Sequence, residues 1–167
     1  MNPSVFESFP YLQTQRLKLG PLRGHPRHAL DEVFSFQGAS KTLLPTPAML
    51  DKLERLYRER QAINWGLVRD GELVGTCGFY RGFNNQTGEI GYVMRQTYRR
   101  QGLLKEAAEA IVQFGFRELQ LKCILAYTTE ENRGSVKALE DLGFQLGQSD
   151  LEKYLKFECF PPKGSQQ

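Results

Sequence analysis

The residues whose types and spacing best fit a chemical role lie in segment 90–107, where an apolar stretch, a polar turn and an amphipathic stretch follow one another. The apolar stretch 90–94 predicts a strand, and the amphipathic stretch predicts a helix. Gly102 stands where the helix begins. The cationic residues around it are Arg99, Arg100 and Lys105. Because the first N–H groups of a helix have no partner within the helix, and because glycine lets the backbone approach a ligand, this junction predicts a phosphate site.

A second strand–turn–helix unit follows along the chain. Segment 122–129 predicts a short strand that, coming after the first unit, is expected to pair in parallel through a crossover. The next helix is expected near 133–142, and Gly143 ends it. Asn132 stands at the start of this helix, and Ser135 carries a hydroxyl group in its first turn.

These two units resemble the GNAT N-acetyltransferases. Segment 99–104 is similar to the Arg/Gln-x-x-Gly-x-Gly/Ala loop that holds the pyrophosphate of acetyl-coenzyme A in that family, although Leu104 stands where the family has a small residue. Segment 132–144 resembles the family's Asn-x-x-Ser/Ala signature, which a helix and a Gly-Phe pair follow. Asn-x-x-Ser, together with 15–19 and 88–92, resembles the RimJ/RimL branch of ribosomal-protein N-acetyltransferases.

The resemblance spans about residues 14–160, in the family's order. It implies an α/β (α+β) GNAT fold: a mixed, mostly antiparallel, twisted sheet with helices on both faces, and a splayed strand pair that holds acetyl-CoA. The implied contacts to acetyl-CoA are Val93, Met94, Arg99, Arg100, Gln101, Gly102, Leu103, Leu104, Lys105 and Asn132. The backbone N–H of Val93 or Met94 would polarise the thioester carbonyl. Asn132 either bonds to the pantetheine amides or caps its helix.

Transfer of an acetyl group to an amine requires a base for the ammonium proton, donors for the oxyanion and an acid for the leaving thiolate. Many GNAT enzymes carry a tyrosine in the last helix as that acid, and Leu139 occupies the matching position here. The resemblance makes Ser135 the substitute. Glu89, at the start of the strand that leads to the cofactor, is the first candidate for the base, and Glu152 is the second.

The remaining elements follow from hydrophobic periodicity and turn residues. One helix is expected at 27–36, and another begins at Pro47 with Thr46 as its cap. A further helix is expected at about 101–119. Strands are expected at 16–19, 63–68, 73–80, 89–94, 144–146 and 151–160, with turns at the Asp70-Gly71 pair and at 82–88.

Length and composition restrict the class of protein. The 167 residues predict a single N-acetyltransferase domain, 1–167, with a core of about 14–160 and flexible ends. A net charge of +3 is too small to indicate a nucleic-acid partner. No apolar run approaches the ~18 residues of a membrane span, and the first residues lack the order of a signal peptide. The three separated cysteines indicate buried free thiols in a reducing cytoplasm. Two histidines and three scattered cysteines predict no metal site.

The sequence therefore predicts an N-acetyltransferase that moves the acetyl group of acetyl-CoA to a primary amine. The acceptor stays open between a protein N-terminal α-amine, such as that of a ribosomal protein, and a small molecule. It is expected to contact the two early helices, the loop 43–47 and the last hairpin. The alternative is a catalytically weak GNAT-like module that senses acyl-CoA. Both a monomer and a homodimer are compatible with the sequence.

Overall fold

The computed structural model describes residues 1–35 and 44–164, which form a mixed α/β fold around one sheet. The helices are η1 (Pro3–Phe6), α1 (Arg27–Phe34), α2 (Thr46–Arg58), η2 (Gln96–Tyr98), α3 (Leu103–Arg117) and α4 (Arg133–Asp141). The strands are β1 (Leu12–Gln13), β2 (Lys18–Gly20), β3 (Ile63–Arg69), β4 (Glu72–Asn84), β5 (Thr87–Met94), β6 (Cys123–Thr128), β7 (Gln145–Leu146) and β8 (Leu155–Cys159).

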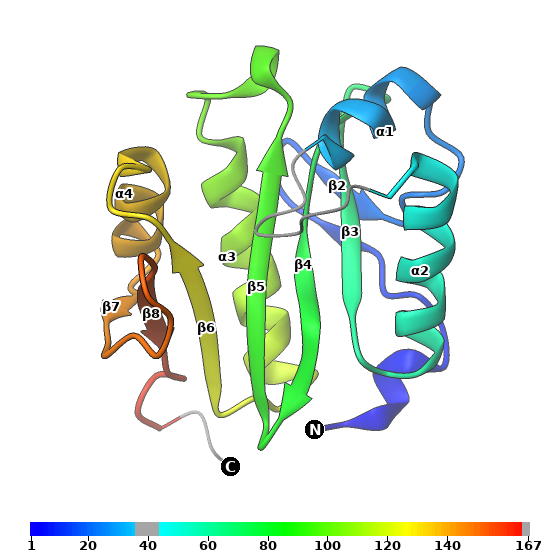
Figure 1. The fold of residues 1–167 in the computed structure, drawn as a ribbon. Helices are drawn as coiled ribbons and strands as arrows, with labels where there is room; N and C mark the ends of the chain where they lie inside the picture. Colours follow the sequence, from blue (N-terminus) through cyan, green and yellow to red (C-terminus); the bar gives the residue numbers. More distant parts are fainter. Residues whose placement is uncertain (36–43, 165–167) are drawn as a thin grey trace.

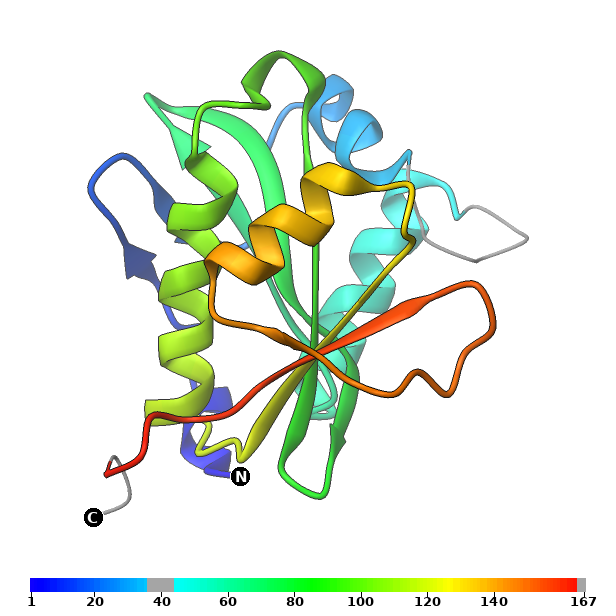
Figure 2. The same cartoon turned by 90° about the vertical axis from the view of Figure 1, so that its left-hand side faces the viewer.

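Within the described ranges, the sheet has eight strands in the order β1-β2-β3-β4-β5-β6-β8-β7. The β5–β6 pair is parallel and the other neighbours are antiparallel. Helix α3 connects β5 to β6 and covers one face of the sheet, while α1 and α2 cover the other (Figures 1 and 2). The predicted fold class and the predicted parallel crossover are both confirmed.

The core explains why α3 forms where it does. Leu103, Ala107, Ile111 and Phe114 recur at helical spacing and are buried in the same cluster as Trp65 of β3. A second buried cluster lies under α1 and α2 on the other face of the sheet. No helix in the described part of the chain has the length and apolar character needed to cross a membrane.

The turns between the central strands agree with their residue types. Asp70 and Gly71 both have positive φ values (51° and 84°), as a two-residue type I′ hairpin turn requires. The second turn is shorter than predicted, because β4 runs on to Asn84. Asn85 and Gln86, with φ values of 52° and 58°, make this turn.

One prediction about the first third of the chain was wrong in detail. Thr46 is the first residue of α2 and not its cap; its hydroxyl donates to Asp31 of α1, and the extended Pro45 precedes the helix. The start of the chain contains η1 and β1. The indole N–H of Trp65 donates to the carbonyl oxygen of Pro10 at 2.7 Å, which attaches this segment to the core.

Candidate active site

The site begins where two neighbouring strands separate. β5 and β6 are paired at Thr87–Cys123, Gly88–Ile124 and Glu89–Leu125. Beyond these three pairs β5 continues to Met94 and β6 to Thr128, and the two strands diverge (Figure 1). This divergence is the splayed strand pair that the sequence predicted.

The backbone of β5 presents polar groups to this gap. The N–H of Arg95 donates to the carbonyl oxygen of Val74 at 2.9 Å, so Arg95 faces β4. Residues along a regular antiparallel pair face the partner alternately, and Val93 therefore also faces β4. Tyr92 and Met94 direct their backbone groups away from β4, toward the gap. Of the two residues named from the sequence, Met94 is the one whose N–H points to the gap.

The start of α3 supplies donors at the open end of the gap. Gly102 precedes the helix in the left-handed region, with φ of 74°. The first bond of the helix runs from the Glu106 N–H to the Gly102 carbonyl oxygen at 3.1 Å. The N–H groups of Leu103, Leu104 and Lys105 therefore have no acceptor within the helix. Leu103 is buried and Leu104 is half-buried against the core, so the large residue at this position serves packing while its N–H is retained.

The three cationic side chains predicted around this turn do not behave alike. The Arg99 Nε donates to the carbonyl oxygen of Met94 at 3.0 Å, so its guanidinium is already hydrogen-bonded to the last residue of β5. Arg100 is exposed and has a positive φ of 60°. Lys105 is 47% exposed, with Glu109 at 3.9 Å. Arg100 and Lys105 are therefore the freer cations.

Arg16 is a fourth cation at this turn, and sequence reasoning assigned it no role at the site. Its guanidinium donates to the Gln101 carbonyl oxygen at 2.8 Å and to Glu106 Oε2 at 2.7 Å. A Cβ on Gly102 would lie 3.4 Å from its Nη2 atom. The segment 15–19 carries part of the family resemblance, but Arg16 and Glu106 are 90 positions apart in sequence, which hid the contact.

Glu106 holds this arrangement together in the first turn of α3. It accepts hydrogen bonds from the Thr14 hydroxyl at 2.5 Å and from the Arg16 N–H at 2.7 Å. Burial opposes ionisation of this carboxyl, but the hydrogen bonds from Thr14 and Arg16 outweigh burial and lower its pKa. A carboxylate here also complements the positive end of the helix dipole.

The first turn of α4 brings a hydroxyl pair to the gap. Asn132 caps the helix, since its Oδ1 accepts from the Ser135 N–H at 3.2 Å. The Ser135 Oγ lies 2.6 Å from the Tyr92 hydroxyl oxygen of β5. Leu139, one turn further on, is only 1% exposed and packs in the core. The local sequence around Tyr92 does not indicate this hydroxyl partner, because Ser135 lies 43 residues further along the chain.

The two candidate bases lie in different surroundings. Glu89 belongs to the last β5–β6 pair, and its side chain is 13% exposed. The Tyr80 hydroxyl donates to it at 2.8 Å, and Arg81 Nε lies at 3.5 Å. Glu152 is exposed in the turn that precedes β8. The structure thus brings Glu89, and not Glu152, to the point where the gap begins.

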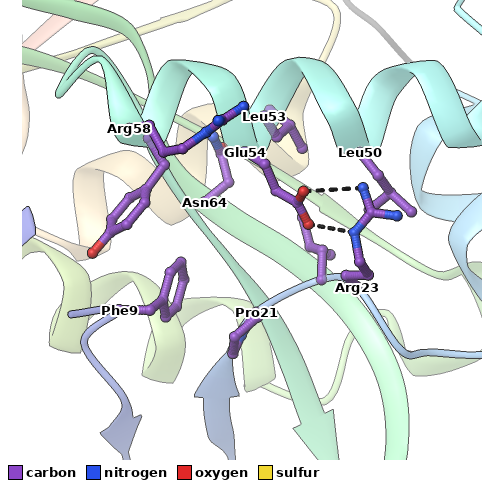
Figure 3. Close-up of a pocket in the computed structure, with 10 residues that line it drawn as sticks. Phe9, Pro21, Arg23, Leu50, Leu53, Glu54, Arg58 and Asn64 are labelled. Atoms are coloured by element: carbon purple, nitrogen blue, oxygen red, sulfur yellow. Dashed lines mark hydrogen bonds and ion pairs between the residues drawn. The ribbon is translucent and has the colours of Figure 1, made fainter.

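A separate cavity of about 240 Å³ lies between α2 and the segments around β2 and β3 (Figure 3). Phe9 and Pro21 form one wall, and Leu53 belongs to the α2 side. Arg23 and Glu54 form an ion pair at its edge. None of the predicted site residues lines this cavity. In the described ranges, no group of three His, Cys, Asp or Glu side chains could hold a metal ion.

Comparison with known proteins identifies the class. The Acetyltransferase (GNAT) domain family matches residues 16–145, which is most of the chain. The uncharacterized N-acetyltransferase YoaA of Bacillus subtilis is 31% identical over 148 residues, covering 82% of this chain and 84% of YoaA. This chain belongs to the GNAT acetyltransferase family, and it is an N-acetyltransferase.

Solved structures show the same fold. RimJ of Mycobacterium smegmatis, in complex with CoA-disulfide, superposes with a TM-score of 0.78 at 18% identity, covering 99% of this chain and 93% of RimJ. A putative ribosomal-protein-serine acetyltransferase of Vibrio cholerae gives a TM-score of 0.75 at 20% identity, covering 96% and 100%. At these identities the similarity establishes the fold alone.

Proposed function

We propose that this protein transfers the acetyl group of acetyl-CoA to a primary amine, with the pantetheine arm in the gap between β5 and β6 and the pyrophosphate at the start of α3. One observation carries the proposal. The gap presents the backbone groups of Tyr92 and Met94 along its length, and it leads to a helix start whose N–H groups are unpaired within the helix. The left-handed Gly102 leaves that helix start accessible, as a bound pyrophosphate requires.

The residues that the sequence proposed as acetyl-CoA contacts would bind different parts of the cofactor. Met94 would direct its N–H toward the thioester carbonyl, while the backbone of residues 100–105 would bind the phosphates. Arg100 and Lys105 add positive charge, and Arg16 adds more from the neighbouring β2 segment. Asn132 is engaged as a helix cap through its Oδ1, so its amide N–H₂ group is the part that can reach a pantetheine carbonyl.

We propose Glu89 as the group that receives the proton of the incoming amine, directly or through water. Its position at the closed end of the gap and its limited exposure support this role. The Tyr80 hydroxyl holds one carboxylate oxygen, which leaves the other oxygen able to accept a proton. Tyr127 of β6 donates to Asp150 at 2.8 Å, which adds a second carboxylate near this part of the sheet. Two carboxylates there suit a cationic amine.

The acceptor class is a primary amine, and the N-terminal α-amine of a protein is the first candidate. The RimJ and Vibrio cholerae structures carry the names of ribosomal-protein acetyltransferases, which motivates this choice. The acceptor was expected to contact α1, α2, the loop 43–47 and the last hairpin. Leu43 of that loop lies outside the described residues.

The test is a thiol-release assay with purified full-length protein and acetyl-CoA. The panel contains peptides with a free N-terminal Ser or Ala, the same peptides with a blocked N-terminus, spermidine and kanamycin. Thiol release with a free amine, together with thermal stabilisation by CoA, is the expected result. Stabilisation without thiol release from any acceptor would support the acyl-CoA sensor instead. Absence of both would contradict acetyl-CoA binding itself.

A further inference from the structure

Two hydroxyl groups meet across the place where the sheet is open. Tyr92 belongs to β5 beyond its last pair with β6, and Ser135 lies in the first turn of α4, which follows β6. Their oxygens are 2.6 Å apart, a short hydrogen bond between side chains 43 residues apart in sequence. The contact therefore joins the two sides of the gap. It does so at Tyr92, whose backbone groups also face the gap.

We propose that Tyr92 is a positioning residue for acetyl transfer: it orients the Ser135 hydroxyl toward the leaving sulfur and replaces the proton that Ser135 gives up. The inference rests on the proposed function and supplies the acid that Leu139 cannot provide. When the carbon–sulfur bond breaks, its electron pair stays on sulfur. Sulfur takes the Ser135 proton, and Ser135 takes the Tyr92 proton. The phenolate of Tyr92 is reprotonated from solvent, and the amine's own proton leaves through Glu89.

The acidities of the two hydroxyls favour a proton transfer from Tyr92 to Ser135 as Ser135 protonates the sulfur. A serine hydroxyl alone is a very weak acid, whereas a phenol with an ordinary pKa of about 10 is much closer to a thiol at about 8.5. Burial raises the pKa of Tyr92, and the hydrogen bond with Ser135 opposes that rise. Ser135 lies at the positive end of the α4 dipole, which stabilises negative charge on its oxygen as the proton departs.

The surroundings of Tyr92 separate it from the other tyrosines near the gap. Tyr80 and Tyr127 donate to carboxylates, which accept hydrogen bonds but have no proton to relay when ionised. Tyr92 is bonded to a hydroxyl, which donates and accepts at once. Cys77 lies opposite Tyr92 on β4, and its complete burial raises the pKa of its thiol, so this neighbour stays neutral.

The first experiment compares Tyr92→Phe, Ser135→Ala and the double variant in steady-state kinetics. Each single variant should lower kcat toward the small end of the ~10²–10⁴-fold range of general-acid effects, with the KM for acetyl-CoA unchanged. The double variant should be about as slow as either single variant, because the two groups act as one unit. Ser135→Thr, which keeps the hydroxyl, should restore most of the rate.

The matched control is Tyr11→Phe, which removes a hydroxyl from a side chain that is 74% exposed just before β1, at the other end of the sheet from β6. It should leave kcat unchanged. Two results would overturn the inference and leave the proposed function intact. One is a kcat loss in the Tyr92/Ser135 double variant equal to the product of the two single losses, and the other is a normal kcat in Tyr92→Phe. A wild-type protein without thiol release would overturn the proposed function, and this inference with it.

A second readout needs no turnover. In NMR spectra of protein labelled at the tyrosine Cζ carbon, the Tyr92 resonance should titrate with a midpoint above the ordinary tyrosine pKa of about 10. In Ser135→Ala its midpoint should move further up, because the bond that lowers the pKa of Tyr92 is lost. The resonance of Tyr57 in α2, whose hydroxyl lies 3.5 Å from the Val5 carbonyl oxygen, is the control and should not move between the two proteins. A Tyr92 midpoint unaffected by Ser135→Ala would show that the two hydroxyls do not share a proton, and it would overturn the relay.

Discussion

Replacing Gly102 with valine tests the proposed phosphate site most directly. Gly102 has φ of 74°, where an L-residue costs roughly 1–2 kcal/mol and a β-branched one is especially disfavoured. A Cβ there would meet only the Arg16 Nη2 atom among the described residues, at an ordinary 3.4 Å. The protein should therefore fold with a Tm lowered by about 2–4 °C per kcal/mol. Relief of the strain would turn the first N–H groups of α3 away from their present direction.

The effect on binding follows from the same geometry. Loss of one charge-assisted hydrogen bond to phosphate costs about 1.5–3 kcal/mol, which is about a 10- to 150-fold weaker Kd. Isothermal titration calorimetry with CoA measures this without any acceptor, and the Tm is measured in parallel. Gly102→Asn, which tolerates left-handed backbone, should lose much less affinity.

Gly24→Val is the matched control. Gly24 also has a positive φ, of 98°, and a Cβ added there would have no atom of the described residues within 4 Å. It lies outside the proposed site. This variant should lose similar stability and keep its CoA affinity. A folded Gly102→Val protein that binds CoA as tightly as the Gly24→Val control would refute the assignment of the phosphate site.

Three further predictions concern the base, the α3 start and metals. Glu89→Gln should lower kcat while Glu152→Gln stays near wild type; the reverse order in thiol release would make Glu152 the base. Glu106→Gln should lower the Tm at pH 7, and calorimetry should show the deficit shrinking as pH falls. The reason is that the pKa of the Glu106 carboxyl in the folded protein lies below its unfolded value of about 4.3, so the ionised group stabilises the fold at pH values above 4.3. This stabilisation is lost as the pH falls through the folded-state pKa. A deficit that stayed constant with pH would contradict this. EDTA should leave thiol release unchanged, since the described residues hold no metal-type cluster; inactivation reversed by a divalent ion would disprove this.

Periodicity and turn chemistry made most of the fold predictable. The apolar stripe of α3 and the Asp70-Gly71 turn each depend on neighbours in sequence, and both agree with the structure. The strand, glycine and helix around Gly102 were predictable for the same reason, because they are consecutive. Thr46 was misplaced by one residue, and its hydroxyl bonds to Asp31 of α1, a contact between separate segments that local cap rules do not include.

The contacts between distant segments could not be predicted in this way. The meeting of Tyr92 with Ser135 depends on how far β5 and β6 diverge, which no local pattern encodes. The sequence ranked Glu89 before Glu152 as the candidate base, but the position of Glu89 in the last β5–β6 pair became visible only with the register of the sheet. Arg16 could be placed at the helix start only when β2 was known to lie near α3.

The short seam between β5 and β6 has a mechanical consequence. In the described chain, three register pairs join a five-stranded part of the sheet, β1 to β5, to a three-stranded part made of β6, β8 and β7. A ligand that hydrogen-bonds to the facing edges of β5 and β6 replaces the hydrogen bonds that these strands no longer make to each other. The shared buried cluster and the Tyr92–Ser135 hydrogen bond already join the two parts, and bound substrate would add to their cohesion. We therefore expect the region carrying α4, β7 and β8 to open locally more readily in the free enzyme than in the complex.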